Sequence, residues 1–243
     1  MNTGKIDPEA LEKFLLEDAL DHMIVNEALD LLLLVIGEKP AASTTAHFEK
    51  LSPGFEKFVE DFSDEFDLFY VTRDVEDTHP ETDENITGSS VFFTDEEERL
   101  DMLRPMEQAT NKDIGKFLGY PEEAVEAFET SRGFREAYQR FEEMMGDEDV
   151  SEEEALDFLE ENTSEKSYSE KFDEKVEEMI QDGKMDRSDE KYLGLVSYVP
   201  RIEEESILSA VEEARRREKV LKEMDEELDV SVGREYLEKI LEA

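Results

Sequence analysis

The sequence predicts a mainly α-helical α+β protein with a small sheet of about three strands, either antiparallel or mixed. Apolar residues recur at helical spacing through most of the 243 residues. Only three short segments combine apolar, aromatic and β-branched residues as strands do. The 15 Phe and 7 Tyr can fill a core, so we expect a folded chain although only 38% of its residues are hydrophobic.

The chain is expected to begin with a long helix. Asp7 is placed as its N-cap and Pro8 as its first residue, a pairing typical of helix starts. Gly37 is placed to end this helix. The last stretch, residues 31–36, is apolar on every side, which predicts the most buried helical segment of the protein. Residues 38–50 are predicted to form a loop.

A second helix and two strands are predicted next. Ser52 and Pro53 repeat the cap-and-proline pattern and precede a stripe of phenylalanines at helical spacing. Residues 66–71 and 90–93 are the predicted strands, and they are expected to pair in antiparallel fashion through a polar, acidic loop at 73–89.

The remaining residues are predicted to be mostly helical. A capping box at Thr94 opens one helix, and the other helices are expected at 111–118, 121–128, 134–145, 151–159, 172–180, 203–228 and 232–242. An alternative for 203–228 is a break near its arginines. Residues 192–199 are the third predicted strand, ended by Pro200. We expect a single domain over 1–243, with a subdivision near 146–150 as the alternative.

The net charge indicates the solvent in which the protein works. The chain has 69 acidic and 27 basic residues and a formal charge of −42. Such a surface repels itself in dilute salt, and molar salt relieves the repulsion because the Debye length falls to about 3 Å near 1 M. The composition predicts a halophilic, archaeal protein of the cytoplasm.

Several classes of protein are disfavoured by what the sequence lacks. Without cysteine there is no disulfide, thiolate metal site or thiol nucleophile. The N-terminus does not resemble a secretion leader, and the longest apolar run, 31–36, is far shorter than a membrane span of about 18 residues. Residues 215–217, all arginine, form the one basic cluster together with Lys219 and Lys222. Neighbouring glutamates favour ion pairing within the helix over nucleic acid as a partner.

The most distinctive segment is KFLGYPEEAVEAF, residues 116–128. Physically it is a helix end, a glycine C-cap and a proline-started helix whose acidic first turn suits the helix dipole. It also resembles the Gly-Tyr-Pro-x-Cys-Cys-x-x-Phe signature of an uncharacterised, largely archaeal family. A later strand ending in Pro-Cys-x-x-x-Cys is typical of that family, and residues 197–205, SYVPRIEEE, are similar to it. The resemblance in layout covers about residues 50–228.

The departures from the family signatures bear on function. Four thiols at these positions imply a zinc or iron–sulfur site in relatives. Here the four positions hold Glu123, Ala124, Arg201 and Glu205, so no metal site and no cofactor are predicted. An ion pair of Arg201 with Glu123 or Glu205 is the expected substitute for the metal crosslink. These three residues and Tyr120 are candidate binding residues.

Two further candidates lie in the polar segments. His47 stands near Ser43, Thr44 and Thr45, in a loop suited to an anion, although no glycine-rich phosphate motif is present. Arg73 opens the acidic loop that also contains His79, whose surroundings favour a solvated loop over a metal site. His22, within the first helix, is expected to be structural.

These observations favour a non-catalytic binding or scaffold protein that lacks its family's metal site and has an unidentified protein or small molecule as its partner. The first alternative is an enzyme that acts on a nucleotide or RNA through carboxylates and histidine. It predicts a pocket that joins His47, Arg73 or Arg201 to carboxylates. The second alternative, a subunit of a larger assembly, predicts an exposed apolar patch, formed by residues 31–36.

Overall fold

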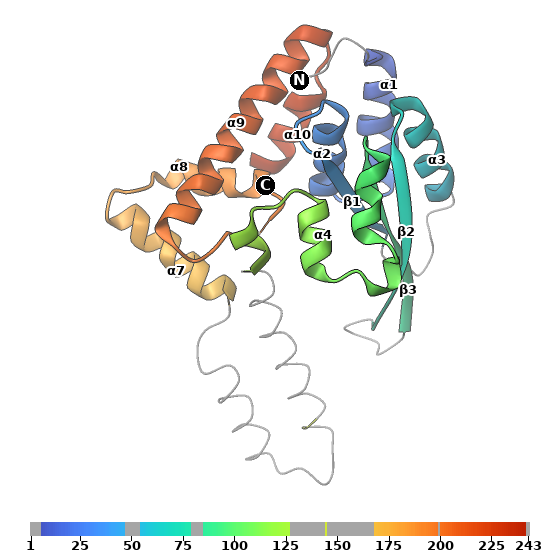
Figure 1. The fold of residues 1–243 in the computed structure, drawn as a ribbon. Helices are drawn as coiled ribbons and strands as arrows, with labels where there is room; N and C mark the ends of the chain where they lie inside the picture. The colour runs from blue at the N-terminus through green and yellow to red at the C-terminus, as the bar shows by residue number, and fades with distance from the viewer. Residues whose placement is uncertain are drawn as a thin grey trace. The chain divides into compact units, whose positions relative to one another are not determined.

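The computed structural model describes residues 6–46, 54–78, 85–126, 144, 168–198 and 200–241. The described part is a mainly helical α+β fold with one three-stranded antiparallel sheet (Figure 1), which confirms the predicted fold class. Contacts divide the chain into a first unit, residues 1–120 with 214–243, and a second unit, residues 121–213. Residues 146–150 lie outside the described residues, so the single domain and its subdivision stay predictions.

The sheet belongs to the first unit and has the order β1-β3-β2. β2 (Phe69–Thr78) and β3 (Asn85–Thr94) pair from Phe69 opposite Thr94 to Thr78 opposite Asn85. The predicted antiparallel pair is confirmed, but both strands are longer than expected, because most of the expected loop at 73–89 is paired.

β1 (Ala41–Ala46) lies on the other side of β3, with Ala41 opposite Thr94. The prediction that residues 38–50 form a loop is therefore wrong for 41–46. The sequence of β1, AASTTA, carries almost no apolar signal. It forms a strand because its backbone groups find partners along the edge of β3, a contact that local periodicity does not encode.

The third predicted strand, 192–199, is also wrong. Lys191–Leu195 forms a 3-10 helix that continues directly from α8 (Arg187–Glu190). A capping box formed by Asp186 and Asp189 starts α8, and Gly194 adds no side chain that could stabilise an extended segment. All three described strands lie in the first unit, so this segment has no described strand beside it.

Helical layers cover both faces of the sheet (Figure 1). Alternation along β3 sends Phe93 toward α3 (Phe55–Phe66), where it meets Phe62 with ring centroids 5.9 Å apart. Phe92 points to the opposite face and meets Phe117 of α4 (Asn111–Phe117) at 6.0 Å. A buried cluster fills that second face: Ala41, Phe92, Leu100, Leu103, Met106, Phe117 and Leu118.

The long N-terminal helix predicted over residues 8–36 is interrupted. α1 (Pro8–Glu12) continues as a π-helical turn and a 3-10 turn to Asp21, and α2 (Val25–Val35) starts after an irregular step at 22–24. The Asp7 cap is confirmed, since its carboxylate accepts the Glu9 N–H at 3.0 Å. The break separates two packing directions, because Phe14 contacts the phenylalanines of α3 whereas α2 contacts β1 and α10.

The burial of residues 31–36 follows the prediction. Leu31, Leu32, Leu33 and Ile36 are fully buried, and Gly37, at a φ of +74°, follows the end of α2. The exposed apolar patch that the assembly hypothesis expected from this segment is therefore contradicted.

α9 (Glu204–Leu228) is one continuous helix, so the alternative of a break near residues 215–217 is wrong. Arg216 forms a salt bridge with Glu38, and Lys222 forms one with Glu218 at 2.8 Å within the helix. Opposite charges thus surround the basic run and offset its self-repulsion. None of the described helices is both long and apolar enough to cross a bilayer.

α10 (Val232–Leu241) folds back onto the end of α9. The buried Asp225 carboxylate accepts the N–H groups of Gly233 and Arg234, both at 2.8 Å, and so caps α10. A Cβ on Gly233 would lie 2.7 Å from the Leu221 carbonyl oxygen, so this close contact requires glycine. Tyr236, fully buried, donates its hydroxyl to the Leu15 carbonyl.

The described part of the second unit has its own small core. α7 (Tyr168–Gln181) is followed by Gly183 at a φ of +69°, as predicted for the end of that helix. Five buried residues pack together there: Val176, Met179, Met185, Ile207 and Val211. The predicted helices at 134–145 and 151–159 lie outside the described residues, apart from residue 144.

Candidate functional site

The Gly-Tyr part of the distinctive motif packs against the turn that follows α2. Gly119 has a φ of +75°, and a Cβ there would lie only 2.6 Å from Pro40 Cγ. Glycine is therefore required both by backbone conformation and by space. The next residue, Tyr120, places its ring 5.2 Å from the Lys39 ammonium. This part of the motif thus has a structural explanation in the first unit.

Tyr120 belongs to a buried ionic cluster, which we define as Asp30, Lys39, Tyr120 and Arg217. Lys39 Nζ donates to Asp30 Oδ2 at 2.6 Å, and the two side chains are only 4% and 8% exposed. Arg217 is likewise buried. Burial raises the pKa of the Tyr120 hydroxyl, the negative charge of Asp30 raises it further, and Arg217 opposes the shift.

The chemistry of this cluster is that of a structural element. The Lys39 ammonium is held by a carboxylate and lies over the face of an aromatic ring, which stabilises the cation. A lysine so held and so covered does not reach an external substrate. Sequence reasoning selected Tyr120 from the family signature but missed its partners, because Asp30 and Arg217 come from distant segments.

In the second unit, Arg201 forms a salt bridge with Glu126. The predicted partners Glu123 and Glu205 are exposed, and no ion pair joins either of them to Arg201 within the described residues. The expected pairing of Arg201 with Glu123 or Glu205 is therefore wrong, and Arg201 pairs with Glu126, three residues beyond Glu123 in the helical segment 122–126. Residues three apart share a helix face, which is why the sequence could not distinguish them.

Of the remaining candidates, only Arg73 and His22 lie among the described residues, both in the first unit. Arg73 lies on β2 opposite Ser90, on the face of the sheet that also carries Val71 and Phe92. His47 and His79 lie outside the described residues. His22 packs its ring against Phe55 and Phe58, with centroids 5.9 and 5.4 Å away, as expected for a structural histidine.

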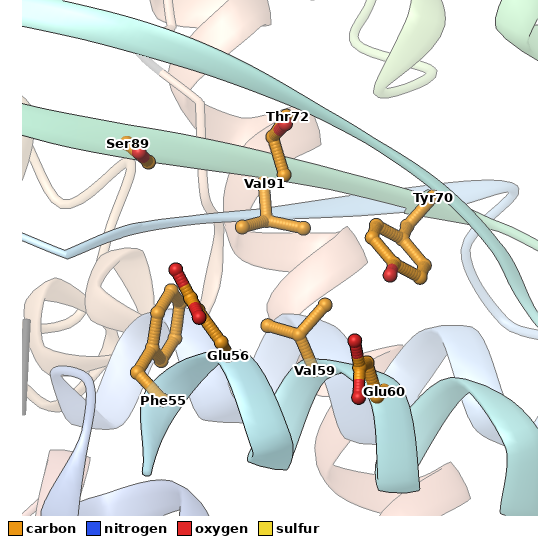
Figure 2. A pocket seen from close by; sticks show the side chains of 8 residues that line it. All are labelled: Phe55, Glu56, Val59, Glu60, Tyr70, Thr72, Ser89 and Val91. Carbon is orange, nitrogen blue, oxygen red and sulfur yellow. The ribbon is translucent and has the colours of Figure 1, made fainter. Parts of the chain in front are cut away.

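A cavity that sequence reasoning missed lies between α3 and the sheet, with a volume of about 350 Å³. Figure 2 shows the side chains that line it, four from the helix and four from the strands: Phe55, Glu56, Val59, Glu60, Tyr70, Thr72, Ser89 and Val91. We call it the α3–sheet cavity. These residues share one space because side chains three or four positions apart lie on the same face of α3, and every second side chain of a strand points to the same face of the sheet.

The walls of the α3–sheet cavity differ in chemistry. Val59 and Val91 face one another and are buried, as is Phe55 (Figure 2). The carboxylates of Glu56 and Glu60 rise from α3 toward the strands, and the Tyr70 hydroxyl points toward the helix (Figure 2). The cavity therefore has an apolar centre between two carboxylates, with hydroxyl groups on the strand side.

The two glutamates form no salt bridge in the described part of the first unit. Lys57, on the same helix, forms its salt bridge with Asp61, and that pairing raises the pKa of Lys57. No described residue forms an ion pair or hydrogen bond with Glu56 or Glu60. Their spacing of four residues makes them a like-charged pair on one helix face, an unfavourable arrangement.

A second cavity, of about 320 Å³, lies where α2 and α3 end. Four acidic residues line it, namely Asp7, Glu65, Asp67 and Asp95. Even so, no group of three or more histidine, aspartate or glutamate side chains in the described residues is arranged to hold a metal ion.

Comparison with known proteins adds no relative. No protein-family model, no curated protein and no solved structure matches this chain. The resemblance of residues 116–128 and 197–205 to an archaeal family therefore stays a prediction.

Proposed function

We propose that this chain is a non-catalytic binding protein of a halophilic cytoplasm, and that it holds a small molecule in the α3–sheet cavity. The observation that supports the proposal most is the chemistry of that cavity. Its volume of about 350 Å³ is at the small end of the range for ligand sites, and it combines apolar walls with a few polar groups.

The cavity lining favours binding over catalysis. Its residues include no lysine or arginine, and no histidine, the side chain whose ordinary pKa lies near neutrality. The predicted enzyme site, in contrast, required a pocket that joins His47, Arg73 or Arg201 to carboxylates, and none of the three lines the α3–sheet cavity. Arg73 is on the other face of the sheet from Tyr70 and Thr72, and Arg201 belongs to the second unit.

The lost metal site is consistent with the same proposal. At one of the positions where the resembled family has thiols, this chain has Arg201, and a salt bridge to Glu126 supplies a crosslink without metal chemistry. The protein would thus retain the fold of the resembled family without its metal site.

The experiment is a ligand-observed NMR screen of small metabolites against the full chain in about 2 M KCl, where charge repulsion is screened. The matched variant is Thr72→Phe, which fills the cavity from an exposed strand position. We expect compounds that bind the natural chain, lose binding to the variant and are recovered chemically unchanged. Chemical conversion of a bound compound would refute the non-catalytic assignment, and an absence of all binding would refute the cavity as a site.

A further inference from the structure

The α3–sheet cavity also indicates the class of its ligand, an inference that rests on the proposed function. We infer that it binds a small organic ammonium compound, whose cationic group lies between Glu56 and Glu60 and whose apolar body lies against Val59 and Val91. No ligand charge other than a positive one suits the two carboxylates that rise into this space (Figure 2).

Glu56 and Glu60 place two exposed carboxylates beside the α3–sheet cavity. They repel one another across one turn of α3, and no described residue forms an ion pair with either of them. The one lysine of the helix, Lys57, pairs with Asp61. A cation between the glutamates would remove the repulsion and gain charge-assisted hydrogen bonds.

An organic cation and a potassium ion differ in what they can bury in the cavity. Potassium at molar concentration screens carboxylates, but it cannot cover apolar surface. An organic cation can bury its own hydrocarbon surface in the cavity, beside Val59 and Val91, which are themselves already buried. The gain from burying a hydrocarbon group there does not depend on charge, so salt does not screen it. A ligand with both a cationic and an apolar part therefore has an advantage over the bulk ion.

Aromatic and hydroxyl groups in the cavity lining also suit an ammonium ligand. The rings of Phe55 and Tyr70 line the cavity, and aromatic faces attract ammonium groups. The hydroxyls of Tyr70 and Thr72 supply acceptors for ammonium N–H donors (Figure 2). An anionic ligand would find two carboxylates and no described cation in the lining.

The test compares three probes of nearly equal shape by ligand-observed NMR titration, with the full chain in about 2 M KCl. They are 2-phenylethylammonium, the neutral 2-phenylethanol and the anionic 3-phenylpropionate. We expect the ammonium compound to bind about fivefold more tightly than the alcohol, as one partly exposed ion pair allows, and the carboxylate to bind most weakly.

Variants assign the effect to the two glutamates. The double replacement Glu56→Gln with Glu60→Gln keeps the shape of the cavity and should bring the affinity for the ammonium compound down to about that of the alcohol. Asp64→Asn removes an acidic group from the same helix outside the cavity lining and should leave both affinities unchanged. Circular dichroism and the thermal midpoint establish that each variant is folded.

The outcomes distinguish this inference from the proposed function. Equal affinity for the ammonium and the alcohol, insensitive to the glutamate replacements, would overturn the inference and leave an apolar ligand site. If all three probes fail to bind while other compounds bind in the metabolite screen, the inference of an ammonium ligand is overturned and the proposed function stands. If no compound binds at all, the proposed function fails as well.

Discussion

Lys39 donates a hydrogen bond to Asp30 at 2.6 Å, and both side chains are more than nine-tenths buried. This pair lies in a chain whose charge of −42 is otherwise characteristic of a solvated surface. Salt reaches surface charges but not a buried pair, so the two kinds of charge should respond differently to solvent and to mutation.

Replacement of Asp30 by Asn should destabilise the protein strongly. The change leaves the Lys39 ammonium buried without its carboxylate, and breaking a buried pair in this way costs about 3–5 kcal/mol. Denaturant unfolding at high salt measures the loss. Asp61→Asn is the matched control, because Asp61 forms an exposed salt bridge with Lys57, and its loss should cost less than about 1 kcal/mol. Similar losses in the two variants would contradict the structural role of the buried pair.

Gly119→Ala should cost more stability than Gly37→Ala. Both glycines have a left-handed φ, near +75° and +74°, so each replacement incurs a backbone cost of about 1 kcal/mol. Only at Gly119 would the new methyl group meet another atom, Pro40 Cγ at 2.6 Å, while nothing lies within 4 Å at Gly37. The overpacking should add about 1–3 kcal/mol. Equal unfolding free energies for the two variants would show that the contact with Pro40 yields easily.

The stability contributed by Asp225 should fall as pH rises through the acid range. Burial raises the pKa of this carboxyl above its ordinary value of about 3.9, although the N–H groups of Gly233 and Arg234 oppose the shift. Between the ordinary and the raised pKa, the folded state binds more protons than the unfolded state. The free energy of unfolding therefore decreases with pH across that window and is constant, for this group, above it.

Asp225→Asn isolates this contribution, since the amide keeps an acceptor for one of the two N–H groups but does not titrate. The unfolding free energy of the natural chain, minus that of the variant, should decrease as the pH rises from the ordinary pKa of about 3.9 through the raised pKa of Asp225, at constant salt. A difference that rises over this range would mean that the hydrogen bonds outweigh burial.

Arg201 should couple energetically to Glu126 and not to Glu123. In a double-mutant cycle with Arg201→Gln and Glu126→Gln, we expect a coupling of about 0.5 kcal/mol, because both side chains are partly exposed. The matched cycle with Glu123→Gln should give a coupling near zero. A larger coupling to Glu123 would favour the pairing that the family resemblance suggested over the one in the structure.

The whole chain should require salt to fold. We expect a higher unfolding free energy in about 2 M KCl than in about 50 mM KCl, because screening removes the repulsion among acidic surface groups. Thermal unfolding followed by circular dichroism at the two concentrations measures the difference. Equal stability at both would contradict the halophilic interpretation of the composition.

Sequence reasoning succeeded where a structural signal is local. The Asp7 cap, the helix that precedes Gly119 and the burial of 31–36 each depend on neighbours within about one or two turns. It failed at β1 and at residues 192–199. β1 has weak propensity and gains its structure from β3, whereas 192–199 has strand composition but no described strand beside it.

The candidate site illustrates the same division. Amphipathicity of α3 and alternation in β2 and β3 are visible in the chain, yet the α3–sheet cavity depends on which residue of β2 lies opposite which residue of β3. A shift of one position would turn Tyr70 and Thr72 to the other face. Tyr120 was found by its motif, but its neighbours Lys39 and Arg217 were not, because they are distant in the chain.

Composition and periodicity alone therefore established the mainly helical α+β class, several helix ends and an unusually acidic chain. The partner of each charge and the shape of each cavity came from the packing of segments far apart, as with Asp30 and Lys39, Arg201 and Glu126, or α3 and the sheet. The physical reason is the distance along the chain over which each signal acts. A repeat of side chains reports which face of an element is buried, whereas a salt bridge or a cavity depends on the position of one element against another.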